Sequence, residues 1–220
     1  MIDLIKKANA DKNLDSEYIG IIDLDYDFFT KNKKSIKNLY YTDFNSIESY
    51  LIDLQLINLL LADYNIPKLD VDRFDKWKKN SLSFSFYFYF QITNISSILK
   101  NDAISFKNLK LCNTTFTDFE NEKINLRKII NTKSQNSSVM SNRFYTWFLK
   151  QERKTIYSNL KLFLHGKHTL SYIICLLKNI DKKIQGLSKE TMIYSLRDKL
   201  MMNKYKEYTL FKEILDFANR

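Results

Sequence analysis

The scarcity of glycine and proline constrains the fold of this chain more than any other feature of its sequence. Only three glycines and one proline occur among its 220 residues. β-Sandwiches, β-barrels and glycine-rich phosphate loops need these residues at tight turns and at close backbone approaches. The composition therefore disfavours those architectures and favours a helical or an α/β fold.

The remaining composition describes a chain that can fold and that carries a strong positive charge. Hydrophobic residues make up 45% and aromatic residues 15%, which excludes an intrinsically disordered protein. The formal net charge of +10 favours polyanionic partners. No window approaches the ~18 uninterrupted apolar residues of a membrane span, and the first residues lack a secretory apolar region. We therefore expect no membrane association.

The two cysteines, Cys112 and Cys175, lie far apart and form no CxxC pair. This spacing indicates neither a disulfide framework nor a zinc ribbon. The expectation is thus a protein of the reducing cytoplasm.

The first half of the chain has the pattern of an α/β fold. Residues 1–13 predict a short amphipathic helix, and Tyr18–Ile22 predict a strand that is apolar on both faces, as in a sheet covered by helices on both sides. Residues 39–41 predict a second strand. A helical pattern then begins near Ile47 and stops before Pro67.

Later segments are less regular. Residues 82–90 alternate like a strand, although the Gly- and Pro-free stretch around them also suits a buried helix, which we favour. The polar tract 131–142 predicts a linker between an α/β part with a helical extension, 1–130, and a mainly helical part, 143–220. Within the second part we expect a strand at 160–164, a turn at 165–169, and helices at 170–184, 188–202 and 209–219.

The strongest chemical signal is a run of acids directly after the first strand. Asp23 and Asp25 are two residues apart, so on an extended backbone they project to the same side, and Asp27 follows. Ligands of open α/β sheets bind where strands end. Paired carboxylates suit Mg²⁺ or Mn²⁺, because an intervening cation removes their repulsion. The alternative is a solvated acidic loop.

Asp43 and Glu48 follow the second predicted strand. If the two strands are parallel neighbours, these acids emerge at the same edge of the sheet as Asp23 and can complete its site. For Glu48 the sequence alone favours a capping box, in which Asn45 caps the helix and Glu48 reaches back to the backbone N–H of the cap.

Three chemistries use an Asp-x-Asp sequence after a strand. A haloacid-dehalogenase-type phosphatase expects Gly and Thr or Val where this chain has Tyr26 and Asp27. A nucleotide-sugar glycosyltransferase needs nucleotide-binding strands upstream, for which there is no room. A Toprim nuclease uses acids at successive strand ends to hold metal for phosphodiester cleavage.

Residues 21–28 (IIDLDYDF) and 41–51 (YTDFNSIESYL) resemble the Toprim-like domain family that supplies the nuclease subunit of the PARIS anti-phage system. Residues 104–109 and 164–170 resemble later segments of that family. The resemblance implies an α/β fold, with a small, mainly parallel sheet between helices and a helical C-terminal part. It also implies Mg²⁺- or Mn²⁺-dependent hydrolysis of DNA or RNA, tRNA among the candidates, in prokaryotic defence with an ATPase partner. The site residues implied by it or by the acidic run are Asp23, Asp25 and Glu48 as catalytic groups, and Asp23, Asp25, Asp27, Asp43 and Glu48 around metal.

One departure from the family changes the expectation for activity. Toprim domains open with a strand ending in Glu-Gly, and only a short helix precedes the strand that leads to Asp23 in this sequence. We therefore expect the chain as given to bind divalent metal weakly and to cut little. The rival hypothesis is an inert Toprim-derived module that binds a protein partner or nucleic acid. A homo-oligomer is compatible with either.

Basic residues near the acids are candidates for contacts with nucleic acid. A loop after the first strand and the turn near residue 167 supply them: Lys31, Lys33, Lys34, Lys37, Lys167 and His168. They can steer a phosphate backbone towards the acids. The alternatives are a solvated loop and an ordinary turn, with Gly166 in a left-handed conformation and Thr169 as helix cap.

Overall fold

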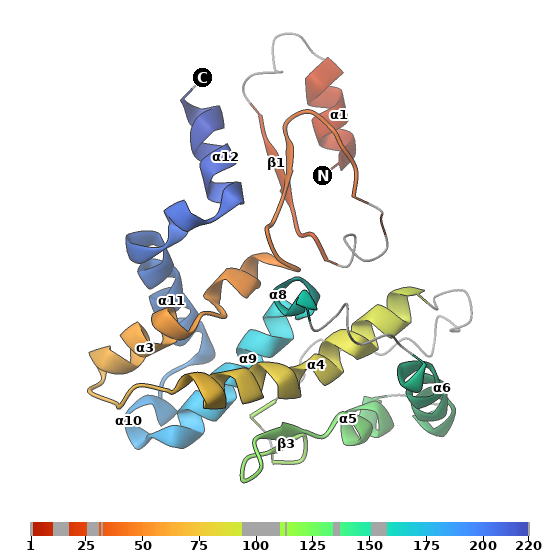
Figure 1. Cartoon of the computed structure of the whole chain (residues 1–220), viewed down its shortest axis with the longest axis vertical. Helices are drawn as coiled ribbons and strands as arrows, with labels where there is room; N and C mark the ends of the chain where they lie inside the picture. The colour runs from red at the N-terminus through yellow and green to blue at the C-terminus, as the bar shows by residue number, and fades with distance from the viewer. Residues whose placement is uncertain are drawn as a thin grey trace.

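The described part of the chain is mostly helical, with a small sheet of two parallel strands and a separate antiparallel pair of two-residue strands (Figure 1). The computed structural model describes residues 2–10, 18–25, 31, 33–93, 111–112, 114–133, 137–150 and 158–219. None of the helices within these ranges is both long enough and apolar enough to cross a membrane.

The predicted parallel strands are confirmed. β1 (Gly20–Ile22) pairs with β2 (Leu39–Tyr41), so that Gly20 lies opposite Leu39 and Ile22 opposite Tyr41. The expectation that the first strand is covered on both faces is wrong, because the Ile21 side chain remains 38% exposed. Both strands run towards the acids, as a site at the carboxyl end requires.

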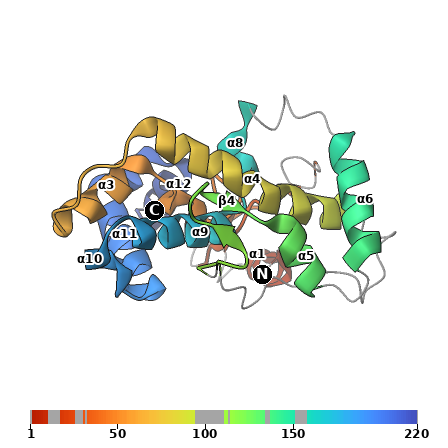
Figure 2. The same cartoon turned by 90° about the horizontal axis from the view of Figure 1, so that it is seen from below.

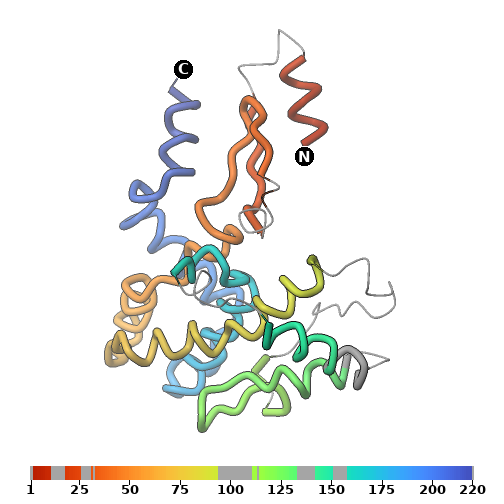
Figure 3. The backbone as a smooth tube through the Cα atoms, turned by 45° about the vertical axis from the view of Figure 1, so that its right-hand side comes forward, coloured from red at the N-terminus to blue at the C-terminus, as the bar shows by residue number. Residues whose placement is uncertain are grey.

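The expected first helix is α1 (Ile2–Ala10), which packs against the start of the strand pair. Ile5 of α1 forms a small core with Leu24, Leu39 and Tyr41. A Cβ atom on Gly20 would lie only 2.5 Å from Cγ1 of Ile5. The glycine thus allows the close approach between α1 and β1. Figure 3 shows α1, the strands and the C-terminal helix projecting from the rest of the molecule.

The rest of the molecule is a helical body. In chain order the elements of this body are η1 (Ile47–Leu51), α3 (Leu54–Asp63), α4 (Val71–Thr93), β3 (Thr117–Asp118), β4 (Lys123–Ile124), α5 (Leu126–Lys133), α6 (Ser137–Leu149), α8 (Leu160–Phe163), α9 (Gly166–Ile180), α10 (Lys182–Gln185), α11 (Lys189–Asn203) and η2 (Tyr205–Glu207). The projecting C-terminal helix is α12 (Thr209–Ala218). In Figure 2, α4 runs from the α3 and α11 end of this body to the α5 and α6 end.

The alternating segment 82–90 is helical, as we favoured, and belongs to α4. Its aromatic side chains need no strand, because α6 and α9 pack against different sides of this helix. Tyr87 contacts Phe144 of α6 with ring centroids 5.2 Å apart, and Phe86 contacts Phe163 of α8 at 4.9 Å. Neighbouring elements on several sides of α4 therefore bury consecutive side chains of this segment, such as Phe86 and Tyr87.

The polar tract 131–142 is largely helical: α5 covers its start and α6 its end. Ile129 and Ile130 before the tract and Phe144 after it belong to the same buried core, together with Trp77 and Tyr172. Side chains from both of the expected parts therefore pack into one core.

Predictions for the C-terminal part are partly wrong. Residues 160–163 form the helix α8 instead of a strand, and the expected turn from residue 165 is the beginning of α9. Gly166 is the first residue of α9 and has no positive φ. Thr169 lies inside α9 and is no cap. The predicted helices at 188–202 and 209–219 are confirmed as α11, capped by Ser188, and α12.

The expectation of unpaired cysteines is also wrong, because Cys112 and Cys175 form a disulfide. Cys175 lies on the buried side of α9, and the bond connects α9 to the segment before β3. Leu111 beside Cys112 is buried, and its carbonyl accepts a hydrogen bond from the Thr117 hydroxyl at 2.6 Å. Packing of this segment onto α9 brings together two sulfurs that are 63 residues apart in sequence.

Candidate functional site

The segments that follow β1 and β2 are joined by reciprocal hydrogen bonds. The backbone N–H of Asp25 donates to the carbonyl of Asn45 at 2.7 Å, and Nδ2 of Asn45 donates to the carbonyl of Asp25 at 2.6 Å. Leu24 N–H also donates to Oγ1 of Thr42 at 2.9 Å. These contacts fix the path of the chain on either side of Asp23, and they explain why Asn45 is fully buried.

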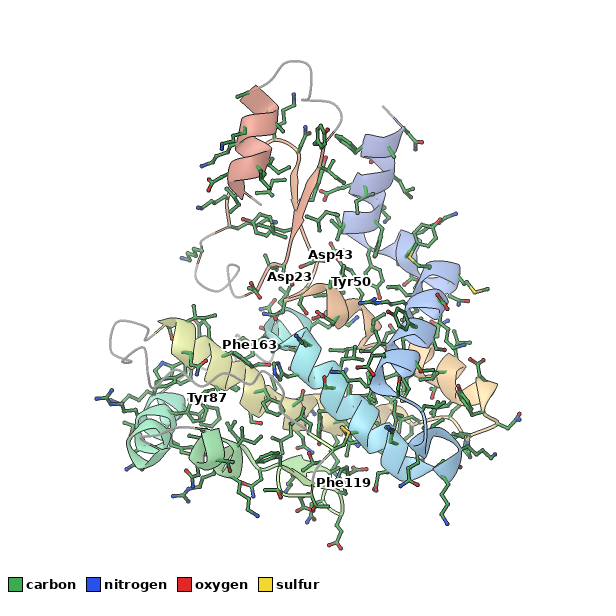
Figure 4. All side chains as sticks on the ribbon, turned by 180° about the vertical axis from the view of Figure 1, so that it is seen from behind. Asp23, Asp43, Tyr50, Tyr87, Phe119 and Phe163 are labelled. Atoms are coloured by element: carbon green, nitrogen blue, oxygen red, sulfur yellow. A yellow bond between two sulfur atoms is a disulfide. The ribbon has the colours of Figure 1, made fainter. Side chains whose placement is uncertain are left out.

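Asp23 lies at the end of the strand pair that faces η1 (Figure 4). Its Oδ1 accepts a hydrogen bond from the backbone N–H of Ile47 at 2.8 Å, and the residue is exposed. Partial burial of the carboxyl raises its pKa, the Ile47 hydrogen bond opposes this, and the charge of Glu48 raises the pKa further. A cation beside the Asp23 carboxylate would favour its charged form.

Glu48 lies in the first turn of η1, half-buried, and interacts electrostatically with Asp23, His165 and Lys189. The predicted capping box of Asn45 and Glu48 is wrong. The helix is capped at Ser46, and the reciprocal side chain is Ser49, whose hydroxyl accepts from Ser46 N–H at 3.4 Å. Asn45 precedes this cap by one residue, and its Nδ2 donates to the Asp25 carbonyl instead.

The start of α9 packs directly on η1. A Cβ atom on Gly166 would lie 2.3 Å from Oγ of Ser46, 2.4 Å from Oγ of Ser49 and 2.8 Å from the Ser49 backbone nitrogen. Glycine is therefore required for this contact between segments more than a hundred residues apart. We call the region formed by Asp23, Ser46–Ser49 and His165–His168 the Asp23 edge.

The two histidines of this edge face each other. Nδ1 of His165 lies 3.1 Å from Nδ1 of His168, and the His165 ring stacks on Phe88 with centroids 4.1 Å apart. Burial lowers the pKa of His165 to about 4, so this ring is neutral at physiological pH. His168, predicted to contact phosphate, is half-buried against Phe84 and Phe88, whereas Lys167 is exposed.

The Asp43 side chain is engaged by a different part of the molecule. Its Oδ2 accepts hydrogen bonds from the Tyr50 hydroxyl at 3.0 Å and from the backbone N–H of Leu210 at 3.2 Å. Leu210 is in the first turn of α12, so Asp43 anchors that helix to the end of β2. Burial and the nearby Asp43 charge raise the pKa of Tyr50.

Asp25 is exposed and adopts a left-handed conformation with φ of 45°. Asp27 lies outside the described residues, as does the segment 104–109. Within the described ranges, no group of three or more His, Cys, Asp or Glu side chains is placed to hold a metal ion. Mg²⁺, however, usually keeps several waters and binds through one or two carboxylates and substrate phosphates. Asp23 and Glu48 provide two such carboxylates, so the oxygen donors at this edge suit a hydrated hard cation.

The lysines of the predicted basic loop lie in different parts of the molecule. Lys33 and Lys34 are exposed and line a cleft between the strand ends and α12. Lys37 lies before β2, at the opposite end of the strand pair from Asp23, where its carbonyl accepts a hydrogen bond from Asn9. Lys31 is exposed in a left-handed turn with φ of 57°.

Two residues of the site were missed by sequence reasoning. Asn45 was interpreted only as a cap, and Lys189, the first residue of α11, gave no signal at all. Burial lowers the pKa of Lys189, whereas the charges of Glu190 and then Glu48 raise it, so this amine interacts electrostatically with the Asp23 edge. Only the packing of α11 and α9 on η1 brings Lys189 there.

No family model matches the chain, and no curated protein or solved structure matches it either. The support for a function is therefore the arrangement of residues around Asp23.

Proposed function

We propose that the chain is a Toprim-type nuclease that hydrolyses phosphodiester bonds of DNA or RNA with Mg²⁺ or Mn²⁺ at the Asp23 edge. One observation carries this proposal. The segments 21–28, 41–51 and 164–170 each resemble that family, and contacts of Ile47 with Asp23 and of Gly166 with Ser46 join them. They thereby contribute Asp23, Glu48 and Lys167 to one region. The resemblance places such a nuclease in anti-phage defence, beside an ATPase partner.

The acidic side of this edge is the proposed metal position. Asp23 and Glu48 would hold the cation, with Asp25 two residues further along the chain. A bound Mg²⁺ supplies positive charge for the phosphate and lowers the pKa of a coordinated water. The hydrogen bond from Ile47 N–H to Oδ1 of Asp23 orients the carboxylate, because it fixes one oxygen against η1.

The basic side is the proposed phosphate position. Lys167 is exposed in the first turn of α9, where helix N–H groups carry partial positive charge. Lys189 is also within electrostatic reach of Glu48. His165 stays neutral at physiological pH, so its contribution is to position His168 and Phe88 instead of adding charge.

A second candidate function is an inert module that binds nucleic acid or a protein partner without cutting. The observation in its favour is that backbone groups already engage two of the acids. Asp23 accepts from Ile47 N–H, and Asp43 accepts from Leu210 N–H. Both contacts stabilise the fold without any metal.

Cleavage assays with Asp23→Asn separate these candidates. We expect Mg²⁺-dependent cutting of tRNA, single-stranded or duplex substrates to fall by more than about 100-fold in this variant. This exceeds what loss of an outer-shell partner of a metal costs. Because the family opens with a Glu-bearing strand, the assay includes any in-frame extension that the gene encodes upstream of Met1.

Asp198→Asn is the matched control, since Asp198 is an exposed acid on α11. It should leave cutting unchanged. Metal-dependent cutting that survives in Asp23→Asn would refute the proposed site. If neither the chain nor its extension cuts any substrate but nucleic acid still binds, the inert module is the correct function.

A further inference from the structure

A cleft of about 570 Å³ lies beside the ends of β1 and β2, with Leu24, the neighbour of Asp23, in its lining, and the proposed metal and phosphate positions do not use it. It is bounded by the end of the strand pair, the loop before β2 and the start of α12. Its lining residues are Leu24, Lys33, Lys34, Ser35, Ile36, Leu39, Tyr40, Tyr41, Thr42, Asp43, Leu162, Thr209 and Glu213.

Two of the lining residues are lysines, on a loop that is held in place. Lys33 and Lys34 are both exposed, and Nζ of Lys33 lies 5.0 Å from the centroid of the Tyr41 ring. The hydroxyl of Tyr41 accepts a hydrogen bond from the backbone N–H of Lys34 at 2.9 Å. Because Tyr41 is buried at the end of β2, this bond fixes the lysine loop against the sheet. The ammonium groups provide a site for a phosphate group.

Other lining residues supply an aromatic ring together with neutral and acidic oxygens. Tyr40 is half-buried and contributes to the wall, while Thr209 and Glu213 contribute from the first turns of α12. Aromatic rings stack on nucleobases of any sequence, and carboxylate and hydroxyl oxygens accept hydrogen bonds from base amines and ribose hydroxyls. Asp43 also lines the cleft but contributes few acceptors to a ligand, because its Oδ2 already accepts from the Tyr50 hydroxyl and from Leu210 N–H.

We propose that this cleft seats one nucleotide of a single-stranded nucleic acid, with its phosphate at Lys33 and Lys34 and its base against Tyr40. This inference rests on the proposed function, because it names unpaired strands as the substrate class of the Asp23 edge. The cleft includes Leu24 and Thr42, which flank the acids that end both strands. A nucleic-acid strand seated there therefore lies beside the ends of β1 and β2. A duplex does not fit, because its bases are paired and stacked inside and cannot reach Tyr40.

The charge of the cleft is tested by fluorescence anisotropy with a labelled single-stranded 12-mer, in EDTA so that no cleavage occurs. Lys33→Gln with Lys34→Gln should weaken binding at least about tenfold. The negative slope of log K against log salt concentration should become shallower by roughly 1.4, the value for two phosphates of a single strand. The control is Lys6→Gln with Lys7→Gln, which removes two exposed lysines from α1. An equal loss in both double variants would mean non-specific attraction and would overturn the proposal.

The base position is tested with Tyr40→Leu, which keeps an apolar side chain and removes the ring. Affinity for the 12-mer should fall about tenfold, whereas a matching duplex should bind more weakly and be unaffected by the change. Tyr194→Leu is the control, because Tyr194 is 64% exposed on α11. Unchanged affinity in Tyr40→Leu, with an unchanged circular-dichroism melting curve, would overturn the assignment.

Two further measurements separate strand binding in the cleft from mononucleotide binding and from the nuclease proposal. A mononucleotide should compete weakly, and affinity should rise as the strand is lengthened; binding of the mononucleotide alone would overturn the assignment to a strand. Asp23→Asn should bind the 12-mer as the wild type does. If it does so while the wild type cuts no substrate either, the nuclease proposal fails and the cleft remains a single-strand site.

Discussion

Replacing Gly166 by alanine is expected to lower the free energy of unfolding by about 1–3 kcal/mol, the usual cost of forcing atoms into a packed contact. The new Cβ would overlap the hydroxyls of Ser46 and Ser49 and approach the Ser49 backbone nitrogen at 2.8 Å. The hydroxyls can rotate away, but the backbone of η1 has to move. Urea unfolding measures the change. Binding of nucleic acid at the Asp23 edge should weaken as well, because α9 and η1 separate.

Gly186→Ala is the matched control. Nothing lies within 4 Å of a Cβ at Gly186, and its φ of −75° and ψ of −15° suit alanine. This change should be neutral or stabilise the protein by up to about 1 kcal/mol, since alanine restricts the unfolded chain. Similar stability of the two glycine variants would contradict the close packing of α9 on η1.

Loss of the Cys112–Cys175 disulfide is expected to destabilise the protein by about 2–4 kcal/mol. The bond closes a sequence separation of 63 residues, which restricts the unfolded chain more than a short loop does. Urea unfolding of the wild type should therefore shift to lower urea when dithiothreitol is added. Cys112→Ser should reproduce the shift, because Cys112 is exposed and serine fits there.

The same variant provides the control for the reductant. Stability of Cys112→Ser should not change on adding dithiothreitol, since it has no bond left to reduce. Identical unfolding curves for the wild type with and without reductant, and for the variant, would show that the two cysteines are not bonded in solution. The sequence-based expectation of free cysteines would then be right.

Local patterns were sufficient to predict several elements of this fold. The apolar run before Asp23 predicts β1, and Ser188 marks the start of α11. The placement of acids after parallel strands also follows from local sequence, since it needs only the end of each strand. These features depend on residues close together in the chain.

Features that depend on distant residues were predicted poorly. Leu160–Leu164 alternates like a strand, but Phe163 packs on Phe86 of α4 within a short helix. The role of Gly166 in the contact with Ser46 depends on residues far away in the chain. The disulfide and the anchoring of α12 by Asp43 likewise depend on tertiary packing, which no local pattern reports.

Thermal unfolding with added Mn²⁺ or Mg²⁺ tests most directly whether the Asp23 edge binds metal. A ligand that binds only the folded state stabilises it, by about 2.7 kcal/mol at a hundredfold excess over Kd. We expect millimolar metal to raise the melting temperature of the wild type and of Asp198→Asn. Asp23→Asn with Asp25→Asn should abolish the rise, and asparagine tolerates the left-handed backbone of residue 25. An equal rise in the wild type and the double variant would contradict the account.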